Sequence, residues 1–113
     1  MREIYAAQYA YREGEWQVLD APMLTTVECL HAIWETTSPE VVAGNALQAF
    51  RNELDPDGAR CAPDAMPRAV GMLNLARALA AQGGAVDAAA ALPLYLRDKV
   101  AETTMERAAR ATA

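Results

Sequence analysis

The opening segment constrains the fold more than any other. Residues 3–12 contain neither glycine nor proline, and their three tyrosines fall on one side of an extended chain while Ile4 falls on the other. A turn follows at Glu13–Glu15, where Gly14 supplies a positive φ at little steric cost. Trp16–Leu24 resumes as a second strand, and Pro22 within it predicts a bulge or a sheet edge because proline lacks the ladder's amide hydrogen. These residues predict a β-hairpin.

The next segment has the periodicity of a helix. The spacing Thr25-x-x-Glu28 predicts a capping box at its start, in which each side chain satisfies the other residue's free backbone amide. Residues 36–39 end the helix. Its core-facing stripe follows the i, i+3, i+4, i+7 pattern and consists of Val27, Leu30, His31 and Trp34.

Short elements occupy the middle of the chain. Val41–Ala43 predicts a brief buried strand, and Ala59–Ala62 a further short strand. Between them, Asn45 is the expected cap of a helix over Ala46–Leu54. A strong turn signal follows this helix at residues 55–58, Asp-Pro-Asp-Gly. The inward-facing residues of the helix are expected to be Leu47, Phe50 and Leu54.

The last third is rich in alanine. Asp64 is expected to cap the longest helix, Ala65–Gln82, which residues 83–84, Gly-Gly, should end through a left-handed turn. After a linker over Ala85–Ala91, leucines at 92, 94 and 96 alternate, which predicts a short strand or an extended arm with one buried face. Beyond residue 103 the chain becomes a polar tail. The long helix is expected to present Met66, Val70, Met72, Leu73, Leu75, Ala76, Leu79 and Ala80 on its apolar surface.

Strands that alternate with helices predict an α/β fold, and 113 residues are enough for one domain with a modest core. Hydrophobic residues make up 53% of the chain but aromatic residues only 6%. Much of the apolar content is alanine, which buries little area per residue, so we expect marginal stability.

The net charge of −5 argues against a large basic face that binds nucleic acid directly. No apolar run is long enough for a membrane span, and residues 1–5 do not resemble a signal peptide. We therefore expect a cytoplasmic protein that binds neither membranes nor nucleic acid directly.

His31 is the only histidine, with Glu28 and Glu35 at helical spacing. A metal site or an acid–base site would require a further ligand or a nucleophile, so we expect His31 to complete a helix face. Cys29 lies two residues away and should fall on another face, which argues against a Cys–His pair. Cys29 and Cys61 match no zinc spacing and are expected to be reduced thiols that are buried or half-buried.

Gly44 and Asn45 lie between a predicted strand and a predicted helix, where phosphate often binds. Neither GxGxxG nor GxxxxGK[ST] is present, so a tight strand-to-helix turn is expected. Arg97 and Lys99 could contact a phosphate, but Asp98 and Glu102 lie among them, which favours a charge cluster facing solvent or a partner. The sequence therefore predicts no catalytic, cofactor-binding or metal-binding residue and no cofactor.

The two ends of the chain resemble those of one family. Pro93–Arg97 followed by Asp98–Ala101 resembles the closing segment of TsaB (also called YeaZ). Val42–Ala46 resembles that family's VGTG-type turn, with Asn45-Ala46 replacing the threonine and the second glycine. The start of the chain resembles the family segment ARMGEVYWAEY, with Arg2 in place of glycine and with matches at Met1, Glu3, Tyr5, Ala7 and Tyr9.

The resemblance covers nearly all of this chain but only half of a TsaB protein. It implies the C-terminal RNase H-like lobe of an actin/Hsp70/sugar-kinase superfamily member, lacking its first strand, over residues 1–102, with a tail over residues 103–113. The family's first lobe, with its DTS/DTA-type strand and PGSFTGVR-type segment, has no counterpart here.

The resemblance also implies a function. TsaB is a non-catalytic scaffold subunit in N6-threonylcarbamoyladenosine formation at position 37 of ANN-decoding tRNAs. Chemistry belongs to its TsaD partner, which uses a metal and a threonylcarbamoyl-adenylate, and a TsaE-type ATPase is a further partner. TsaD contacts are made mainly through the lobe that has no counterpart here.

Without the first strand of such a lobe, the hairpin and the Val41–Ala43 strand would expose unpaired edges. We therefore expect Met1 to be an internal methionine or a misplaced start, or else a homodimer or a strand rearrangement to fill the gap.

Two alternative functions remain open. One is a self-standing dimerisation module, favoured by the exposed edges. The other is a glycoprotease-type (M22-like) peptidase, a label attached to the wider family, although a single histidine cannot supply the paired histidines of a metallopeptidase.

Overall fold

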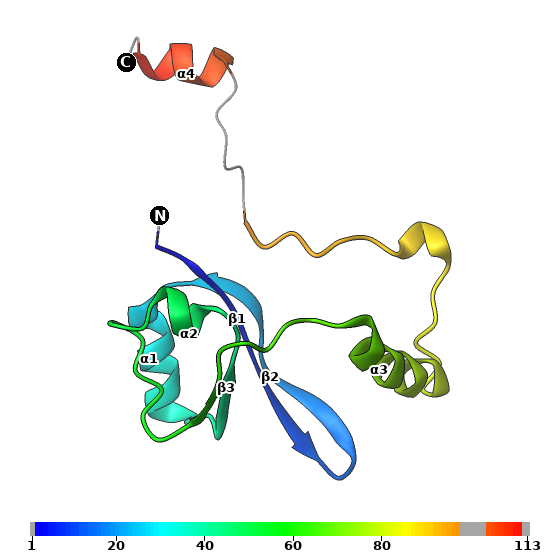
Figure 1. Ribbon diagram of the computed structural model, residues 1–113. Helices are drawn as coiled ribbons and strands as arrows, with labels where there is room; N and C mark the ends of the chain where they lie inside the picture. Colours follow the sequence, from blue (N-terminus) through cyan, green and yellow to red (C-terminus); the bar gives the residue numbers. More distant parts are fainter. Residues whose placement is uncertain (1, 98–103, 112–113) are drawn as a thin grey trace.

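The chain begins with the predicted hairpin, in which β1 (Ile4–Arg12) pairs antiparallel with β2 (Glu15–Thr25). The computed structural model, which describes residues 2–97 and 104–111, is shown in Figure 1. Glu13 and Gly14 at the turn both have positive φ, 54° and 82°, as in the turns that match the twist of two paired strands. The pairing shifts register between Ala6 and Gln8, opposite the segment that contains Pro22, so the predicted bulge is confirmed.

The first helix, α1 (Val27–Thr36), begins one residue later than predicted. Its cap is Thr26, whose Oγ1 accepts a hydrogen bond from the Cys29 backbone N–H at 3.3 Å. Thr25 instead pairs with Ile4 as the last residue of β2 and is buried, because strand pairing continues to that point. The predicted stripe is confirmed, with Val27 and Leu30 buried and the other two side chains half-buried.

The second sheet is a parallel pair, β3 (Val41–Ala43) and β4 (Arg60–Ala62). Both strands were predicted, but β3 is not buried, because Val41 keeps 44% of its surface exposed. Among the described residues no strand joins this pair to the hairpin, so the chain contains two separate two-stranded sheets. The structure therefore confirms a mixed α/β class, with less strand pairing than one continuous sheet would have.

The connection between β3 and β4 holds a shorter helix than predicted, α2 (Ala46–Ala49). Asn45 has helical angles, φ −71° and ψ −13°, and its side chain makes no cap hydrogen bond. The chain then turns tightly, with the Leu54 backbone N–H donating to the Phe50 carbonyl at 2.8 Å. The predicted inward side chains are nevertheless confirmed, since Leu54 is buried and Leu47 and Phe50 pack beside it.

The core is small and lies where the hairpin, α1 and the segment after α2 meet. Its four buried apolar side chains are Ile4, Val27, Leu30 and Leu54, around which pack Ala6, Trp34, Ala46, Leu47 and Phe50.

The longest helix, α3 (Ala69–Ala81), begins four residues later than predicted. Pro67 disfavours helical angles at Met66, and Arg68 is extended (φ −129°, ψ 140°), so the helix begins only at Ala69. Asp64 does not cap the helix but accepts a hydrogen bond from Gln48 Nε2 at 3.0 Å.

The end of α3 is confirmed. Gly83 has a φ of +77°, and its N–H donates to the Ala80 carbonyl. The Gly84 N–H donates to the Leu79 carbonyl at 2.9 Å, which completes a Schellman motif.

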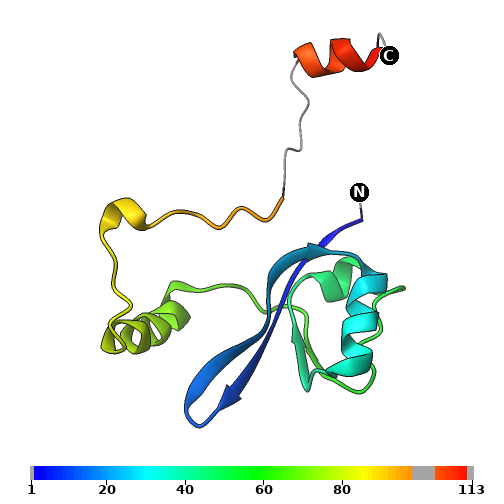
Figure 2. The ribbon, with the colours of Figure 1, turned by 180° about the vertical axis from the view of Figure 1, so that it is seen from behind.

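In both views α3 lies on the opposite side of the hairpin from α1 and α2 (Figures 1 and 2). The apolar surface predicted for it is exposed rather than buried; Val70 keeps 75% and Leu73 63% of its area in contact with solvent. The Cα radius of gyration is 18.2 Å, against about 13 Å for a compact chain of this length.

After α3 the chain makes a 3₁₀ turn, η1 (Ala88–Ala90), capped by Asp87 through the Ala89 N–H at 2.8 Å. The alternating leucines predicted a short strand or an extended arm with one buried face. Residues 91–97 form no strand, and the predicted buried face is wrong, because Leu92 and Leu94 are exposed. An isolated extended segment has no partner for its backbone groups, so alternation alone cannot make it a strand. The tail holds α4 (Thr104–Ala111), as its composition allowed. None of the described helices combines the length and the apolar content that crossing a membrane requires.

Leu30→Ala should lower the free energy of unfolding by about 2–5 kcal/mol, because it opens a cavity in a core of four buried side chains. Leu92→Ala, at an exposed position of similar chemistry, is the control and should change it by less than about 0.5 kcal/mol. Urea unfolding followed by circular dichroism measures both. Equal effects of the two substitutions would contradict the position of the core.

Candidate functional site

His31 has a structural role in the folded chain. Its Nε2 accepts a hydrogen bond from the Asp55 backbone N–H at 3.1 Å, and its ring lies 5.9 Å from that of Trp34. The imidazole therefore links α1 to the turn before β4, consistent with the predicted place on a helix face. Within residues 2–97 and 104–111, no cluster of three or more His, Cys, Asp or Glu side chains is placed to hold a metal ion.

The cysteines differ from the prediction, because both Cys29 and Cys61 are exposed free thiols rather than buried ones. Cys29 lies on the solvent side of α1, while His31 is turned toward Asp55 and hydrogen-bonded there. Cys61 lies on β4, and its thiol approaches the Ala59 carbonyl at 3.6 Å. The core is too small to cover either position.

Gly44 forms the tight strand-to-helix turn that was expected. Its φ of +123° suits glycine, and its N–H donates to the Ala62 carbonyl at 3.0 Å, which continues the β3–β4 pairing. This amide is therefore engaged within the chain, and the four-residue α2 that follows offers no anion-binding helix end.

Arg97 does not face solvent as part of a charge cluster. Its guanidinium lies 3.0 Å from a Glu3 carboxylate oxygen and 5.8 Å from the centre of the Tyr5 ring. The segments that carry the family resemblance at the two ends of the chain are thus in direct contact. The other members of the predicted cluster, Asp98, Lys99 and Glu102, lie outside the described residues.

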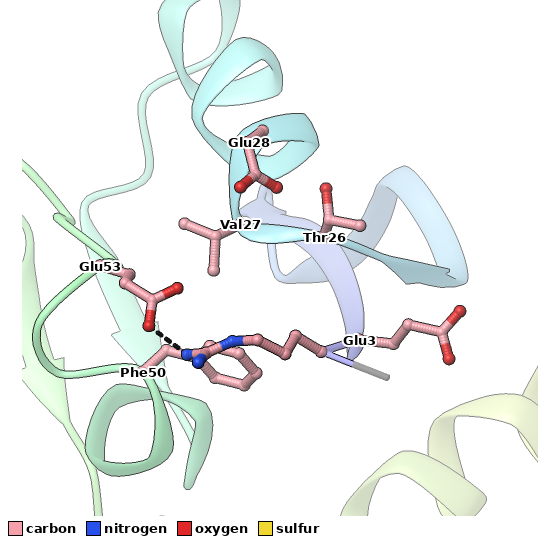
Figure 3. A pocket seen from close by; sticks show the side chains of 7 residues that line it. Glu3, Thr26, Val27, Glu28, Phe50 and Glu53 are labelled. Atoms are coloured by element: carbon pink, nitrogen blue, oxygen red, sulfur yellow. Dashed lines mark hydrogen bonds and ion pairs between the residues drawn. The ribbon is translucent and has the colours of Figure 1, made fainter.

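A depression of about 370 Å³ lies between the start of β1, the start of α1 and the segment after α2 (Figure 3). Arg2 pairs with Glu53 and lies over the Phe50 ring, 5.3 Å from its centre. Glu3, Thr26, Val27 and Glu28 complete the lining. From the sequence, Arg2 was only a departure from a family glycine, and the missed signal was a cation next to the first strand.

The pKa of the Glu28 carboxyl lies below its ordinary value of 4.5. The main cause is a hydrogen bond that the carboxylate accepts from its own backbone N–H, and a second hydrogen bond, from the Thr26 hydroxyl, lowers the pKa further. Glu28 is therefore an ionised acceptor at the first turn of α1, where a negative charge also complements the helix dipole. The Arg2 guanidinium is paired, and the Thr26 oxygen caps α1. These groups tie three segments together and do not pair a nucleophile with a base.

The described residues also form two exposed apolar surfaces. The first, called here the aromatic face, is the side of the hairpin turned away from α1. Tyr11 and Trp16 contact each other on it, with ring centres 5.1 Å apart and ring planes tilted by 53°. Its exposed residues are Tyr5, Tyr9, Tyr11, Trp16 and Val18.

The second, called here the α3 surface, covers most of a helix that is apolar on nearly every side. Such a helix is ordinarily buried, yet each of its large side chains keeps more than half of its area exposed. These residues are Val70, Met72, Leu73, Leu75 and Leu79.

No protein-family model and no curated protein matches this chain. A functional proposal for this chain therefore starts from the exposed apolar surfaces of its described residues.

His31→Leu should lower the free energy of unfolding by about 1 kcal/mol, because the Asp55 N–H loses its acceptor. His31→Gln, which offers an acceptor oxygen at similar reach, should retain much of that stability. Urea unfolding of the two variants measures the difference. If the two are equally destabilised, the hydrogen bond contributes nothing.

The Glu28 carboxylate should make stability depend on pH. Because folding lowers its pKa, its contribution is present above the unfolded value near 4.5 and is lost as the pH falls through the lower folded value. The free energy of unfolding, measured from neutral pH down through this range, should therefore fall less steeply with pH for Glu28→Gln than for the native chain. Glu35→Gln, on the same helix, is the control. Identical slopes for the Glu28 variant and the native chain would contradict the assignment.

Proposed function

We propose that this chain is a non-catalytic protein-binding lobe of the TsaB kind, a scaffold in N6-threonylcarbamoyladenosine formation on tRNA. The observation that carries the protein-binding part is the exposed α3 surface. This helix has few charged residues to interact with water, so covering it with another polypeptide would bury apolar area and lower the free energy.

The tRNA-modification part of the proposal rests on the sequence resemblance at the two ends. Arg97 in the closing segment contacts Glu3 and Tyr5 in the opening one, so both would belong to one structural unit of a TsaB lobe. An antiparallel hairpin, a helix and then a parallel strand pair also follow the element order of an RNase H-like lobe. On this proposal a TsaD-like subunit carries the chemistry, a TsaE-like ATPase assists it, and the complex is cytoplasmic.

A self-standing dimerisation module is the second candidate function. It is favoured by the two separate two-stranded sheets, because each described strand leaves one edge without a neighbouring strand. On this alternative the chain would assemble without any partner from tRNA modification.

Deletion of the gene in its source organism tests the proposal. Bulk tRNA should lose N6-threonylcarbamoyladenosine, measured by mass spectrometry of the nucleosides, and a plasmid copy of the gene should restore it. A plasmid copy carrying Leu73→Glu should restore it less well than one carrying Leu92→Glu, because only the first changes the α3 surface. Unchanged nucleoside levels after deletion would overturn the tRNA-modification proposal.

A further inference from the structure

The aromatic face and the α3 surface are both uncovered, and both belong to the same chain. Each is built on a regular element, one on a paired hairpin and one on a helix closed by a Schellman motif. An apolar helix packed on an apolar sheet face is the ordinary layer arrangement of α/β proteins. The two surfaces therefore have the architecture of two halves of one core.

We propose that two copies of this chain form a dimer in which the α3 surface of each copy packs on the aromatic face of the other. This inference goes beyond the proposed function, since it concerns how the chain completes its own core and does not depend on tRNA modification.

The exposed area is large enough for such a dimer. The chain exposes 9554 Å², whereas a compact monomer of this mass exposes about 6,000 Å². A standard stable interface buries about 800 Å² on each partner. Two reciprocal contacts per dimer would let each copy cover its helix and its hairpin together, which one single-sided contact would not.

The helix and the hairpin carry net charges of opposite sign. Residues 68–82 carry two arginines, Arg68 and Arg77, and no acidic residue. Residues 12–20 of the hairpin carry three carboxylates, Glu13, Glu15 and Asp20, and one basic residue, Arg12. Opposite charges at the rim favour and orient an encounter between the helix of one copy and the hairpin of another.

The connection to α3 favours exchange between copies over closure within one. Residues 63–68 join β4 to α3 and include Pro63 and Pro67, each of which fixes φ. The structure holds α3 beside its own hairpin, where Gln82 Nε2 donates to a Glu15 carboxylate oxygen at 3.3 Å while the apolar side chains remain exposed. A short, stiff connection that keeps an element off its own chain is the arrangement that favours domain swapping.

Sedimentation equilibrium of the full chain tests the association. The native chain should be dimeric, Leu73→Glu and Val18→Lys should each be monomeric, and Leu92→Glu, exposed but outside both surfaces, should stay dimeric. A mixture of Leu73→Glu with Val18→Lys should recover a weaker dimer, because one of the two reciprocal contacts then joins two unaltered surfaces. A monomeric native chain, or a dimer that survives both substitutions, would overturn the proposal.

Cysteine cross-linking distinguishes exchange between copies from closure within one copy. With Cys29 and Cys61 replaced by serine, one variant carries Val18→Cys and another carries Leu73→Cys. Their mixture should form a disulfide-linked heterodimer under mild oxidation, whereas Leu92→Cys with Val18→Cys should not.

A single chain carrying both Val18→Cys and Leu73→Cys gives the decisive result. Intermolecular disulfides would support the proposal, and a monomer with an internal disulfide would show that α3 packs on its own hairpin. Binding of the α3 surface only to a different polypeptide would overturn the dimer as well. None of these outcomes bears on whether deletion of the gene abolishes the tRNA modification, so the two proposals fail separately.

Discussion

The structure depends on one small contact, the meeting of Ile4, Val27, Leu30 and Leu54. It joins the hairpin to α1 and fixes the segment that leads from α2 into β4. The polar ties between these parts are hydrogen bonds and ion pairs near the surface, such as His31 with Asp55 and Arg2 with Glu53. Exposed pairs of this kind contribute little stability, so burial of these four side chains has the dominant part in holding the N-terminal half together.

The composition explains why the core does not extend further. Alanine supplies much of the apolar content, and its side chain buries too little area to attach a distant element. The large side chains of the C-terminal half lie on α3 and on the segment after it, where no described element covers them. The chain therefore combines a folded N-terminal unit with an apolar helix beside it, which is why its surface exceeds that of a compact monomer.

The polar groups and the apolar surfaces of this chain differ in how far they are engaged within it. The polar side chains beside the depression are occupied by structural roles: Thr26 caps α1, Glu28 accepts hydrogen bonds at the same turn, and Arg2 is paired. The extended apolar surfaces, by contrast, have no role within the described chain. Burial of those surfaces would lower the free energy of an assembly, whereas the depression beside Arg2 offers only groups that are already engaged.

The sequence by itself determined the hairpin, the start of the apolar stripe in α1, the turns at Gly14 and Gly44, and the end of α3. Each depends on neighbours within a few residues: alternation, helical spacing, or a glycine that adopts positive φ. Tertiary structure decided the rest. Strand pairing up to Thr25 moved the cap to Thr26, and the early end of α2 let the chain turn and bring Leu54 inward. Periodicity marked the apolar side chains of α3 and the alternating leucines correctly as apolar, but burial requires a second surface, and sequence spacing does not say which surface that is.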